Sequence, residues 1–440
     1  MMAKSIFILM ISLLLFFSCK NEEYVGQTEI TKWQYGKKAA VSLTYDDGTI
    51  NQFRKALPLM DSLGFPATFY IITGNIPGAT YNGAFIGRPV AEIIEETATV
   101  PTNENNLFER ASAIGFLGLQ GTLQYHTQAG ELVDQGKIEE ACKVINEAYQ
   151  KVRAKTFPSK KSATDDPTRD RLTWEEVRQV AANGHEFGSH TITHPRLAVL
   201  DETNLLYELE KSKEEIIKQI GTEHTFSAEC PYGTENERVM EYALKIYPSL
   251  RNRMPEPYLE ELNRWAENTP GSSAKSYVQW QRGPHTDTPM ETMKSWVDTI
   301  LTHDNNWLVL VFHGVEGIGW QAKPITEFEE YFAYMKEKEG DLWITTFRDA
   351  TKYMREKMNT TVEVANENGN IRIALKNDLE PTMYNIALTL KTYVPSGWEK
   401  ISVAQGEIQQ SYTPKKDDTG SFVLYQANPF GQDIMISEGE

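Results

Sequence analysis

The sequence has few cysteines, no excess of positive charge and no apolar run long enough to span a bilayer. It contains Cys19, Cys142 and Cys230, so no disulfide framework holds the fold, and we expect Cys142 and Cys230 to stay free thiols. The net charge of −17 argues against nucleic acid as a partner, because phosphate binding requires a basic surface. What remains is a globular chain of 440 residues, 40% hydrophobic and 24% charged, long enough for a large core and a second small domain.

The apolar stretch near the start, residues 6–17, is too short to cross a membrane as a helix. Ser18 and Cys19 follow it at once, and the chain then turns sharply polar. This order resembles a bacterial lipoprotein signal, which implies a signal peptide over residues 1–18, a lipid-bearing Cys19 and a tether over residues 19–32. The protein would then be anchored in the cell envelope, at the outer membrane or cell surface of a Gram-negative-type bacterium. A plain cleaved signal peptide, with Cys19 unmodified, is the alternative.

Two adjacent carboxylates, Asp46 and Asp47, follow an apolar run at residues 39–43 that predicts a short buried strand. Adjacent residues on a strand point to opposite faces, so both carboxylates share one site only where the strand is ending. One carboxylate can then hold a metal while the other stays free as a base. Asp-Asp-Gly is also ordinary turn chemistry, which is the alternative for this segment taken alone.

The segments after this strand predict a parallel crossover. Residues 51–63 have helical spacing with Pro58 inside, which predicts a kink or an early break, and residues 67–72 predict a second strand. Between residues 74 and 170 the pattern loosens into a long insertion with helical segments. Its clearest helix has an apolar stripe over residues 141–152, which indicates packing and not a cofactor site. An insertion at strand ends is placed to wall one side of a cleft.

Two histidines, His190 and His194, follow a further predicted strand at residues 187–189. Their spacing of four would bring both imidazoles onto one ion if the chain turns helically there. The metalloprotease helix signature has a glutamate directly after the first histidine, but Thr191 occupies that place here. A base for a metal site must therefore come from elsewhere. Two histidines with this spacing also occur often by chance, without binding a metal.

Polar or aromatic residues recur at the carboxyl ends of other predicted strands. Tyr232 follows a short strand, and His313 follows the apolar run at residues 307–312. In a barrel of alternating strands and helices, the carboxyl ends of the strands form the catalytic face. This recurrence at four strand ends favours a functional site over turn chemistry for Asp46 and Asp47.

The ordered set TYDDG, SHTITH, CPYG and VLVFHG resembles the motifs of the polysaccharide deacetylases, carbohydrate esterase family four. The resemblance covers residues 33–357 and implies an α/β fold, the family's distorted (β/α) barrel, with residues 74–170 as a helical insertion. It implies metal-dependent removal of acetyl groups from a glycan, either a polymer containing N-acetylglucosamine or peptidoglycan. An acetyl ester hydrolase on a xylan-type polysaccharide is one alternative. A carbohydrate-binding pseudoenzyme that kept the metal ligands is another.

The resemblance assigns Asp47, His190 and His194 as the metal ligands. One carboxylate and two imidazoles suit a divalent ion, and zinc is the expected metal. The acetylated polysaccharide or oligosaccharide would bind beside it, with positions on the ion left open to water and to the acetyl oxygen.

The resemblance also assigns the proton chemistry. Asp46 is implied as the general base that accepts a proton from the attacking water. The backbone N–H of Tyr232 is implied as the donor to the developing oxyanion, and His313 as the general acid that protonates the departing amine. Because His313 follows a buried strand, we expect a neighbouring carboxylate to keep its imidazole charged and ready to donate.

The chain departs from the family pattern in two places. The family has an arginine two residues before the proline of the third motif, Pro231 here, and that arginine holds the base. Glu229 stands in its place and cannot donate to a carboxylate, so Arg251 or Arg253 is expected to supply the missing cation. The family's fourth motif, with its aspartate and tryptophan, is not recognisable. Trp280 is a candidate for the aromatic wall of the substrate site, with core packing the commoner use of a tryptophan.

From residue 360 onward the sequence consists of short runs of alternating apolar and polar residues, separated by Gly, Asn and Asp. This pattern predicts a small all-β sandwich over residues 358–440. Its aromatic residues Tyr384, Tyr393 and Trp398 are candidates for stacking on sugars, but we expect them to pack within the module.

Overall fold

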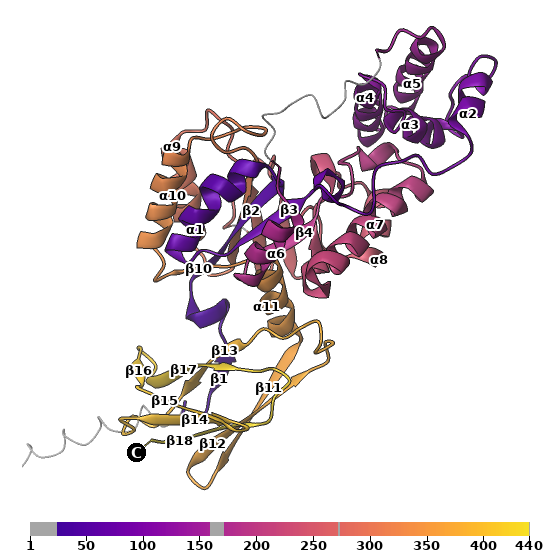
Figure 1. Cartoon of the computed structure of the whole chain (residues 1–440). Coiled ribbons are helices and arrows are strands. Elements are labelled where there is room, and N and C mark those ends of the chain that lie inside the picture. Colours follow the sequence, from indigo (N-terminus) through magenta and orange to yellow (C-terminus); the bar gives the residue numbers. More distant parts are fainter. Residues whose placement is uncertain (1–23, 159–170, 272, 440) are drawn as a thin grey trace, which may run out of the picture. The chain divides into compact units, whose positions relative to one another are not determined.

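The computed structural model describes residues 24–158, 171–271 and 273–439 (Figure 1). These residues form two compact units, one containing residues 39–351 and the other combining residues 24–38 with residues 352–439. The predicted signal peptide and the lipid anchor at Cys19 lie outside the described residues. None of the helices within the described ranges is both long and apolar enough to cross a membrane.

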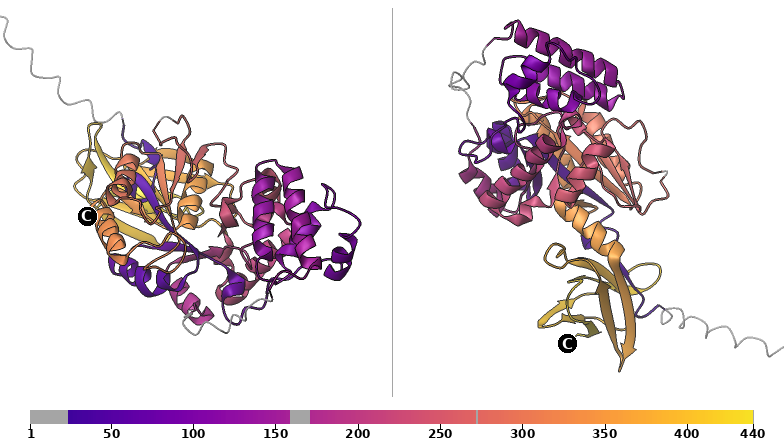
Figure 2. Two further views of the ribbon diagram at one scale, coloured as in Figure 1. Left: turned by 90° about the horizontal axis from the view of Figure 1, so that it is seen from above. Right: turned by 90° about the vertical axis from the view of Figure 1, so that its right-hand side faces the viewer.

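The larger unit is built on a sheet of parallel strands that curls into an open barrel (Figures 1 and 2). Its strand order is β6-β5-β4-β3-β2-β9-β8-β7, and β10 pairs with the first residues of β2. The predicted distorted (β/α) barrel is therefore confirmed. The strands are β2 (Ala39–Asp47), β3 (Ala67–Ile71), β4 (Glu186–Ser189), β5 (Ser227–Ala228), β6 (Ser249–Leu250), β7 (Leu259–Leu262), β8 (Tyr277–Arg282), β9 (Asn306–Phe312) and β10 (Leu342–Ile344).

In the described part of the chain, helices precede or follow the strands of this sheet, four of them contribute buried side chains to its core, and the last one continues into the other unit. The central strands are buried on both faces, as expected of the parallel strands of a barrel covered by helices, and β9 is buried along its whole length. Tyr45, Phe69 and Phe312, from three neighbouring strands, stack within the core. The helices are α1 (Leu57–Leu63), α6 (Trp174–Ala182), α7 (Glu202–Ile220), α8 (Glu237–Ile246), α9 (Met290–Ile300), α10 (Ile325–Glu337) and α11 (Phe347–Asn359).

Local sequence signals set where several helices begin. Thr173 and Glu176 form a reciprocal capping box at the start of α6, and the Asp201 side chain caps α7. The kink or break predicted at Pro58 takes the form of a change of helix type. Residues Gln52–Ala56 make a π-helical turn, and Pro58, which has no N–H to donate, lies where this turn passes into α1.

The insertion is a helical subdomain with its own apolar core. Ala141, Ile145, Ala148 and Tyr149 of the predicted stripe are buried in that core, so the packing interpretation is confirmed. Val199, from the loop that follows β4, packs into the same core. The helices are α2 (Val90–Glu96), α3 (Leu107–Gly115), α4 (Thr122–Asp134) and α5 (Ile138–Arg153).

The smaller unit consists of two antiparallel sheets. One has the order β1-β13-β17-β16 and the other β11-β12-β18-β14-β15. The segment expected to be a tether contributes β1 (Thr28–Ile30), because its backbone completes the edge of β13. Tyr384 and Tyr393 are buried, consistent with packing. The other strands are β11 (Thr360–Glu367), β12 (Asn370–Asn377), β13 (Leu388–Tyr393), β14 (Ile401–Gln405), β15 (Ile408–Tyr412), β16 (Lys415–Lys416), β17 (Ser421–Ala427) and β18 (Ile434–Glu438).

Candidate active site

The two adjacent carboxylates lie at the carboxyl end of β2, in the middle of the sheet. Asp46 is almost fully buried, while Asp47 is partly exposed. Asp47 has a φ of 72°, in the left-handed region, so the alternation of the strand breaks at this residue. This break lets neighbouring side chains face a common site, as the sequence required.

The loop after β4 brings His190 and His194 together, but not by the helical turn that their spacing suggested. The loop is irregular, and Thr191 (φ 66°) and His194 (φ 61°) are both left-handed. The two imidazole rings nevertheless meet with their centroids 4.6 Å apart. The expected pairing of the histidines is therefore present, while the expected helical conformation is wrong.

A buried carboxylate on α7 explains why the loop departs from a helix. Glu208 Oε2 accepts hydrogen bonds from the backbone N–H groups of Ile192 (2.8 Å) and Thr193 (2.9 Å). Glu208 Oε1 accepts from the Thr193 hydroxyl, and the His194 N–H donates to the Thr191 hydroxyl. These donors are thus satisfied by side chains instead of by helical carbonyl groups, which fixes the positions of both histidines.

Asp47, His190 and His194 form the one cluster of possible metal ligands found within the described ranges, with ligand atoms within 4.8 Å of one another. Asp47 Oδ1 lies 3.7 Å from His190 Nε2 and 3.5 Å from His194 Nε2. His190 Nδ1 donates to the backbone carbonyl of Glu229 at 2.9 Å, which leaves Nε2 with a free lone pair. Metal-binding histidines are commonly oriented by such a bond from the other ring nitrogen.

The protonation states of this cluster suit a cation. Burial lowers the pKa of His190 to about 3 and also lowers that of His194, so both imidazoles are neutral and able to donate a lone pair. Burial, with the neighbouring charge of Asp46, raises the pKa of Asp47 to about 7. Two neutral imidazoles beside a carboxylate that lacks a compensating charge are a donor set that fits a divalent metal.

The cation that the third motif lacks is supplied by Arg251, which follows β6. Its guanidinium forms a two-pronged pair with Asp46, Nη1 to Oδ1 at 2.8 Å and Nη2 to Oδ2 at 2.6 Å. Nη2 also lies 2.8 Å from Glu229 Oε1, so Arg251 bridges the two buried carboxylates. The other candidate, Arg253, pairs with Glu237 instead and is much more exposed.

This pair sets the charge of Asp46. Burial by itself would raise the pKa of Asp46. The charge and hydrogen bonds of the Arg251 guanidinium, together with the nearby His313 and His190, nevertheless hold that pKa below its usual range. Burial raises the pKa of Glu229 to about 7. Asp46 is therefore the ionised member, as a base must be. Gln52 holds the backbone of Asp46 in place, because Gln52 Nε2 donates to the carbonyl groups of both Asp46 and His313.

His313 lies at the end of β9, with its Nε2 3.4 Å from Asp46 Oδ2. Burial lowers its pKa to about 4, despite the attraction of Asp46, so the imidazole is neutral. The expectation of a charged His313 is therefore wrong: the predicted carboxylate is there, but removal from water has the larger effect.

Tyr232 follows β5 with a left-handed φ of 62° and an exposed side chain. Its ring packs edge-on against His194 with centroids 4.7 Å apart, and the Arg196 guanidinium lies 5.1 Å from the ring centroid. Pro231 beside it is buried, and the preceding Cys230 N–H donates to Asn252. The third motif therefore reaches the metal-ligand loop through the Tyr232 ring as well as through its backbone.

Helix α4 of the insertion supports the segment that follows His194. Arg196 Nη2 lies 2.8 Å from Asp134 Oδ2, and the Arg196 N–H donates to His126 Nε2 at 3.1 Å. His126 Nδ1 in turn donates to the Ala111 carbonyl, so the imidazole links the insertion to the segment after His194. The insertion thus contacts the site through this segment.

The aromatic side chains beside His313 are ones that the sequence did not single out. Trp280 is buried in the core and does not form a wall. Trp320 instead packs edge-on against His313, with centroids 4.7 Å apart and 48% of the residue exposed, and Trp265 is 64% exposed. Arg264 lies over both tryptophans. These residues lie in loops, where no periodicity marks a tryptophan as exposed.

Two clefts open around this arrangement. One, of about 370 Å³, is lined by Asp47 and by loops after β2, β3 and β9. The other, of about 130 Å³, is lined by Tyr232, Arg251, Arg264 and Trp265 among others. The site is therefore open on two sides of the strand ends.

Fold and site together define a class of protein: a (β/α) barrel with an Asp–His–His cluster of possible metal ligands beside an ionised second carboxylate. Comparison with known families adds a more particular similarity. Residues 34–99 and 132–247 match the model of the polysaccharide deacetylase family. Over these segments, which contain Asp46, Asp47, His190, His194 and Tyr232, the chain is similar to the polysaccharide deacetylases.

Known relatives are distant. The chain is 20% identical over 275 residues to a gellan lyase from Bacillus sp., a match that covers 59% of this chain and only 11% of that protein. Bacillus subtilis PdaA, a family 4 carbohydrate esterase, is 13% identical with a TM-score of 0.33, over 73% of this chain and 83% of its own. A family 4 carbohydrate esterase from Bacillus anthracis is 13% identical with a TM-score of 0.32, over 75% and 98%.

Proposed function

We propose that this protein is a metal-dependent hydrolase that removes acetyl groups from an acetylated glycan, either a polymer containing N-acetylglucosamine or peptidoglycan. The observation that carries the proposal is the juxtaposition of the Asp47–His190–His194 cluster with an Asp46 kept ionised by Arg251. Zn²⁺ is the proposed metal, since one carboxylate and two imidazoles match its usual donors. The lipid anchor at Cys19 and a location in the cell envelope are proposed from the sequence alone.

A divalent metal bound there would polarise the acetyl carbonyl and lower the pKa of a water molecule. The remaining steps fall to the chain's own groups. Asp46 accepts a proton from the water that attacks the carbonyl carbon, while the Tyr232 N–H donates to the oxygen that becomes negative. The C–N bond then breaks, acetate leaves, and the amine takes up a proton. Overall, one water molecule is added across the amide.

His313 is proposed to deliver that last proton. Its Nε2 is 3.4 Å from Asp46 Oδ2, close enough for the proton taken from water to pass between the two groups. Since His313 starts neutral, it must be charged during the reaction before it can protonate the amine. Asp46 and His313 therefore act in sequence on one proton.

The exposed tryptophans support a sugar as the substrate. Trp320 packs against His313, and Trp265 is linked to Trp320 through His285. About half or more of each tryptophan is accessible, which is unusual for such large side chains. An indole face provides a flat apolar surface, and the nearby polar groups of Arg264 and His285 provide hydrogen-bonding partners. This combination suits a pyranose ring, which has apolar faces and polar edges.

The experiment that tests the proposal is acetate release from a panel of acetylated glycans and peptidoglycan, with zinc-loaded and chelator-treated protein. We expect release from at least one N-acetylated glycan, abolished by the chelator and restored by zinc. Arg253→Met is a suitable control variant, because Arg253 is exposed and paired away from the site. Release that is undiminished after the metal has been removed would contradict the metal-dependent reaction.

One observation favours a second candidate, an acetyl ester hydrolase acting on a xylan-type polysaccharide. An alcohol leaves with less help from a proton than an amine does, so a neutral His313 is better suited to an ester. Acetylated xylan in the same panel distinguishes the two. The pseudoenzyme alternative depended on Glu229, and Arg251 supplies the cation that this substitution had removed.

A further inference from the structure

The larger cleft adjoins the cluster of possible metal ligands at Asp47 and lies between the segments after β2, β3 and β9 and the segment before α6. Asp47 lines it, but it shares no lining residue with the smaller cleft at Tyr232 and Trp265. Its volume of about 370 Å³ is within the range of small-molecule binding sites. A glycan unit next to the one being deacetylated would therefore have room here.

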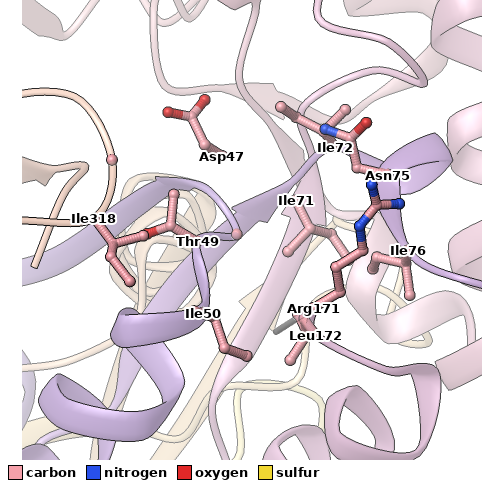
Figure 3. Close-up of a pocket in the computed structure, with 12 residues that line it drawn as sticks. Asp47, Thr49, Ile50, Ile71, Ile72, Asn75, Ile76, Arg171, Leu172 and Ile318 are labelled. Atoms are coloured by element: carbon pink, nitrogen blue, oxygen red, sulfur yellow. The ribbon is translucent and has the colours of Figure 1, made fainter. Parts of the chain in front are cut away.

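The floor of this cleft is apolar. Ile50, Ile71, Ile76 and Leu172 line it, and each is at most 9% exposed (Figure 3). These side chains come from the end of β3, from the segments after β2 and β3 and from the segment before α6, and all belong to the hydrophobic core, which fixes this surface. Such a surface suits the apolar face of a sugar ring.

The far side of the cleft carries the polar groups. In Figure 3 the guanidinium of Arg171 lies with the Asn75 side chain, away from Asp47. Both residues are exposed, and Arg171 makes no ion pair with any residue in the described ranges. An arginine is the side chain best suited to bind a carboxylate, through two parallel N–H···O bonds.

We propose that this cleft binds a carboxylate-bearing sugar unit, such as a uronic acid, adjacent to the acetylated unit, and that Arg171 determines this specificity. The proposal rests on the deacetylase function proposed above. Asn75 donates a further hydrogen bond from its amide, and the isoleucine floor contacts the ring. Arg171 is thus a residue for substrate choice and takes no part in the chemistry at Asp46.

The net charge of the chain argues that the bound sugar carries a single, isolated carboxylate. With a net charge of −17, the protein repels densely charged polyanions, and the cleft offers Arg171 as its cationic side chain. A single carboxylate on an otherwise neutral sugar needs no more than one guanidinium. Because the ion pair between Arg171 and this carboxylate would be exposed to solvent, the preference for the charged sugar should weaken as salt concentration rises.

The test uses the zinc-loaded protein and a matched pair of substrates. One is an oligosaccharide in which N-acetylglucosamine alternates with glucuronic acid, and the other is its methyl ester, which lacks only the charge. We expect kcat/KM for acetate release to favour the acid form by about tenfold, a typical gain for one charge-assisted contact. Arg171→Gln should bring the ratio of the two kcat/KM values close to one. Arg178→Gln, an exposed arginine on α6 that is absent from the cleft, should keep the wild-type ratio.

Binding of the same two oligosaccharides is measured separately by calorimetry on metal-free protein. If the wild type binds the acid form more tightly and Arg171→Gln abolishes this preference, the cleft assignment is supported even when neither compound releases acetate. In that case only the proposed function fails. Equal kcat/KM and equal affinity for the acid and the ester in the wild type would overturn the inference. A preference for the acid that survives in Arg171→Gln would overturn the role of Arg171. If acetate is released in either of these two cases, the proposed deacetylase function is still supported.

Discussion

Replacement of Arg251 is the sharpest perturbation that the site offers. Its guanidinium bridges Asp46 and Glu229, and all three residues are at most 5% exposed. Arg251→Met fills similar space but leaves two carboxylates together in the protein interior. Removing one partner of a buried ion pair typically costs about 3–5 kcal/mol, which is a large share of a typical free energy of unfolding of about 5–15 kcal/mol.

The sign of the pH dependence follows from the pKa of Asp46. In the wild type it is held below its usual value against the effect of burial, so the stability that the pair provides is present above about pH 4 and is lost only as pH falls through the lowered pKa. In Arg251→Met that pKa rises. The deficit in stability should therefore be largest near neutral pH and shrink in acid, where the carboxylates are protonated.

The same change should act on the reaction. We expect kcat/KM for acetate release to fall at least a hundredfold at pH 7, and its acid limb to move to higher pH, because Asp46 must be ionised to accept a proton. Arg251→Lys should restore part of the activity, since an ammonium keeps the charge but not the two-pronged geometry. The assay is a pH–rate profile of zinc-saturated protein together with urea unfolding at pH 5 and pH 8.

Arg253→Met is the matched control, two residues along the chain but paired at the surface with Glu237. It should stay within about 0.5 kcal/mol of the wild type in stability and keep the wild-type profile. An Arg251→Met protein whose acid limb coincides with that of the wild type would refute the role assigned to Arg251. Loss of stability alone, with the profile unmoved, would mean that Arg251 has only a structural role.

Four further outcomes are expected. His190→Ala should bind zinc at least tenfold more weakly by metal analysis, as loss of a ligand implies, and unchanged metal content would remove His190 from the ligand set. His313→Ala should slow amide substrates on the order of a hundredfold but an aryl acetate much less, and equal losses on both would exclude it as the general acid. His126, whose pKa burial lowers to about 4 from an unfolded value of 6.5, should cost the protein at most about 3 kcal/mol of stability as pH falls from 6.5 to 4, and thermal melts of His126→Gln should lack this dependence. Cys19→Ala should move the protein from membrane to soluble fractions, and persistent membrane association would count against the lipid anchor.

The sequence by itself determined most of the scaffold and the reacting groups. Strands and helices followed from apolar periodicity, capping residues and glycines, which act over a few residues. Asp46, Asp47, His190, His194 and His313 stood out because each lies within a few residues of the end of a predicted strand. Parallel strands end at the same edge of the sheet, so that local position predicted that these side chains would meet.

Tertiary structure decided what surrounds those groups. Arg251 reaches Glu229 because β5 and β6 are neighbours in the sheet. It reaches Asp46 although β6 lies four strands from β2, so this contact depends on the curling of the sheet, which the local pattern does not contain. The loop from His190 to His194 takes its shape from Glu208 on another helix, which satisfies backbone donors that a helical turn would have satisfied internally.

The charge of His313 and the exposure of the tryptophans were likewise settled only by packing. Burial outweighs the attraction of Asp46 in setting the pKa of His313, and the extent of burial depends on every element packed around β9. Trp280 is buried while Trp265 and Trp320 stand exposed, although nothing in their local sequence separates them. Desolvation and exposure are properties of the assembled fold, so a single sequence predicts which groups meet but not how far water is excluded from them.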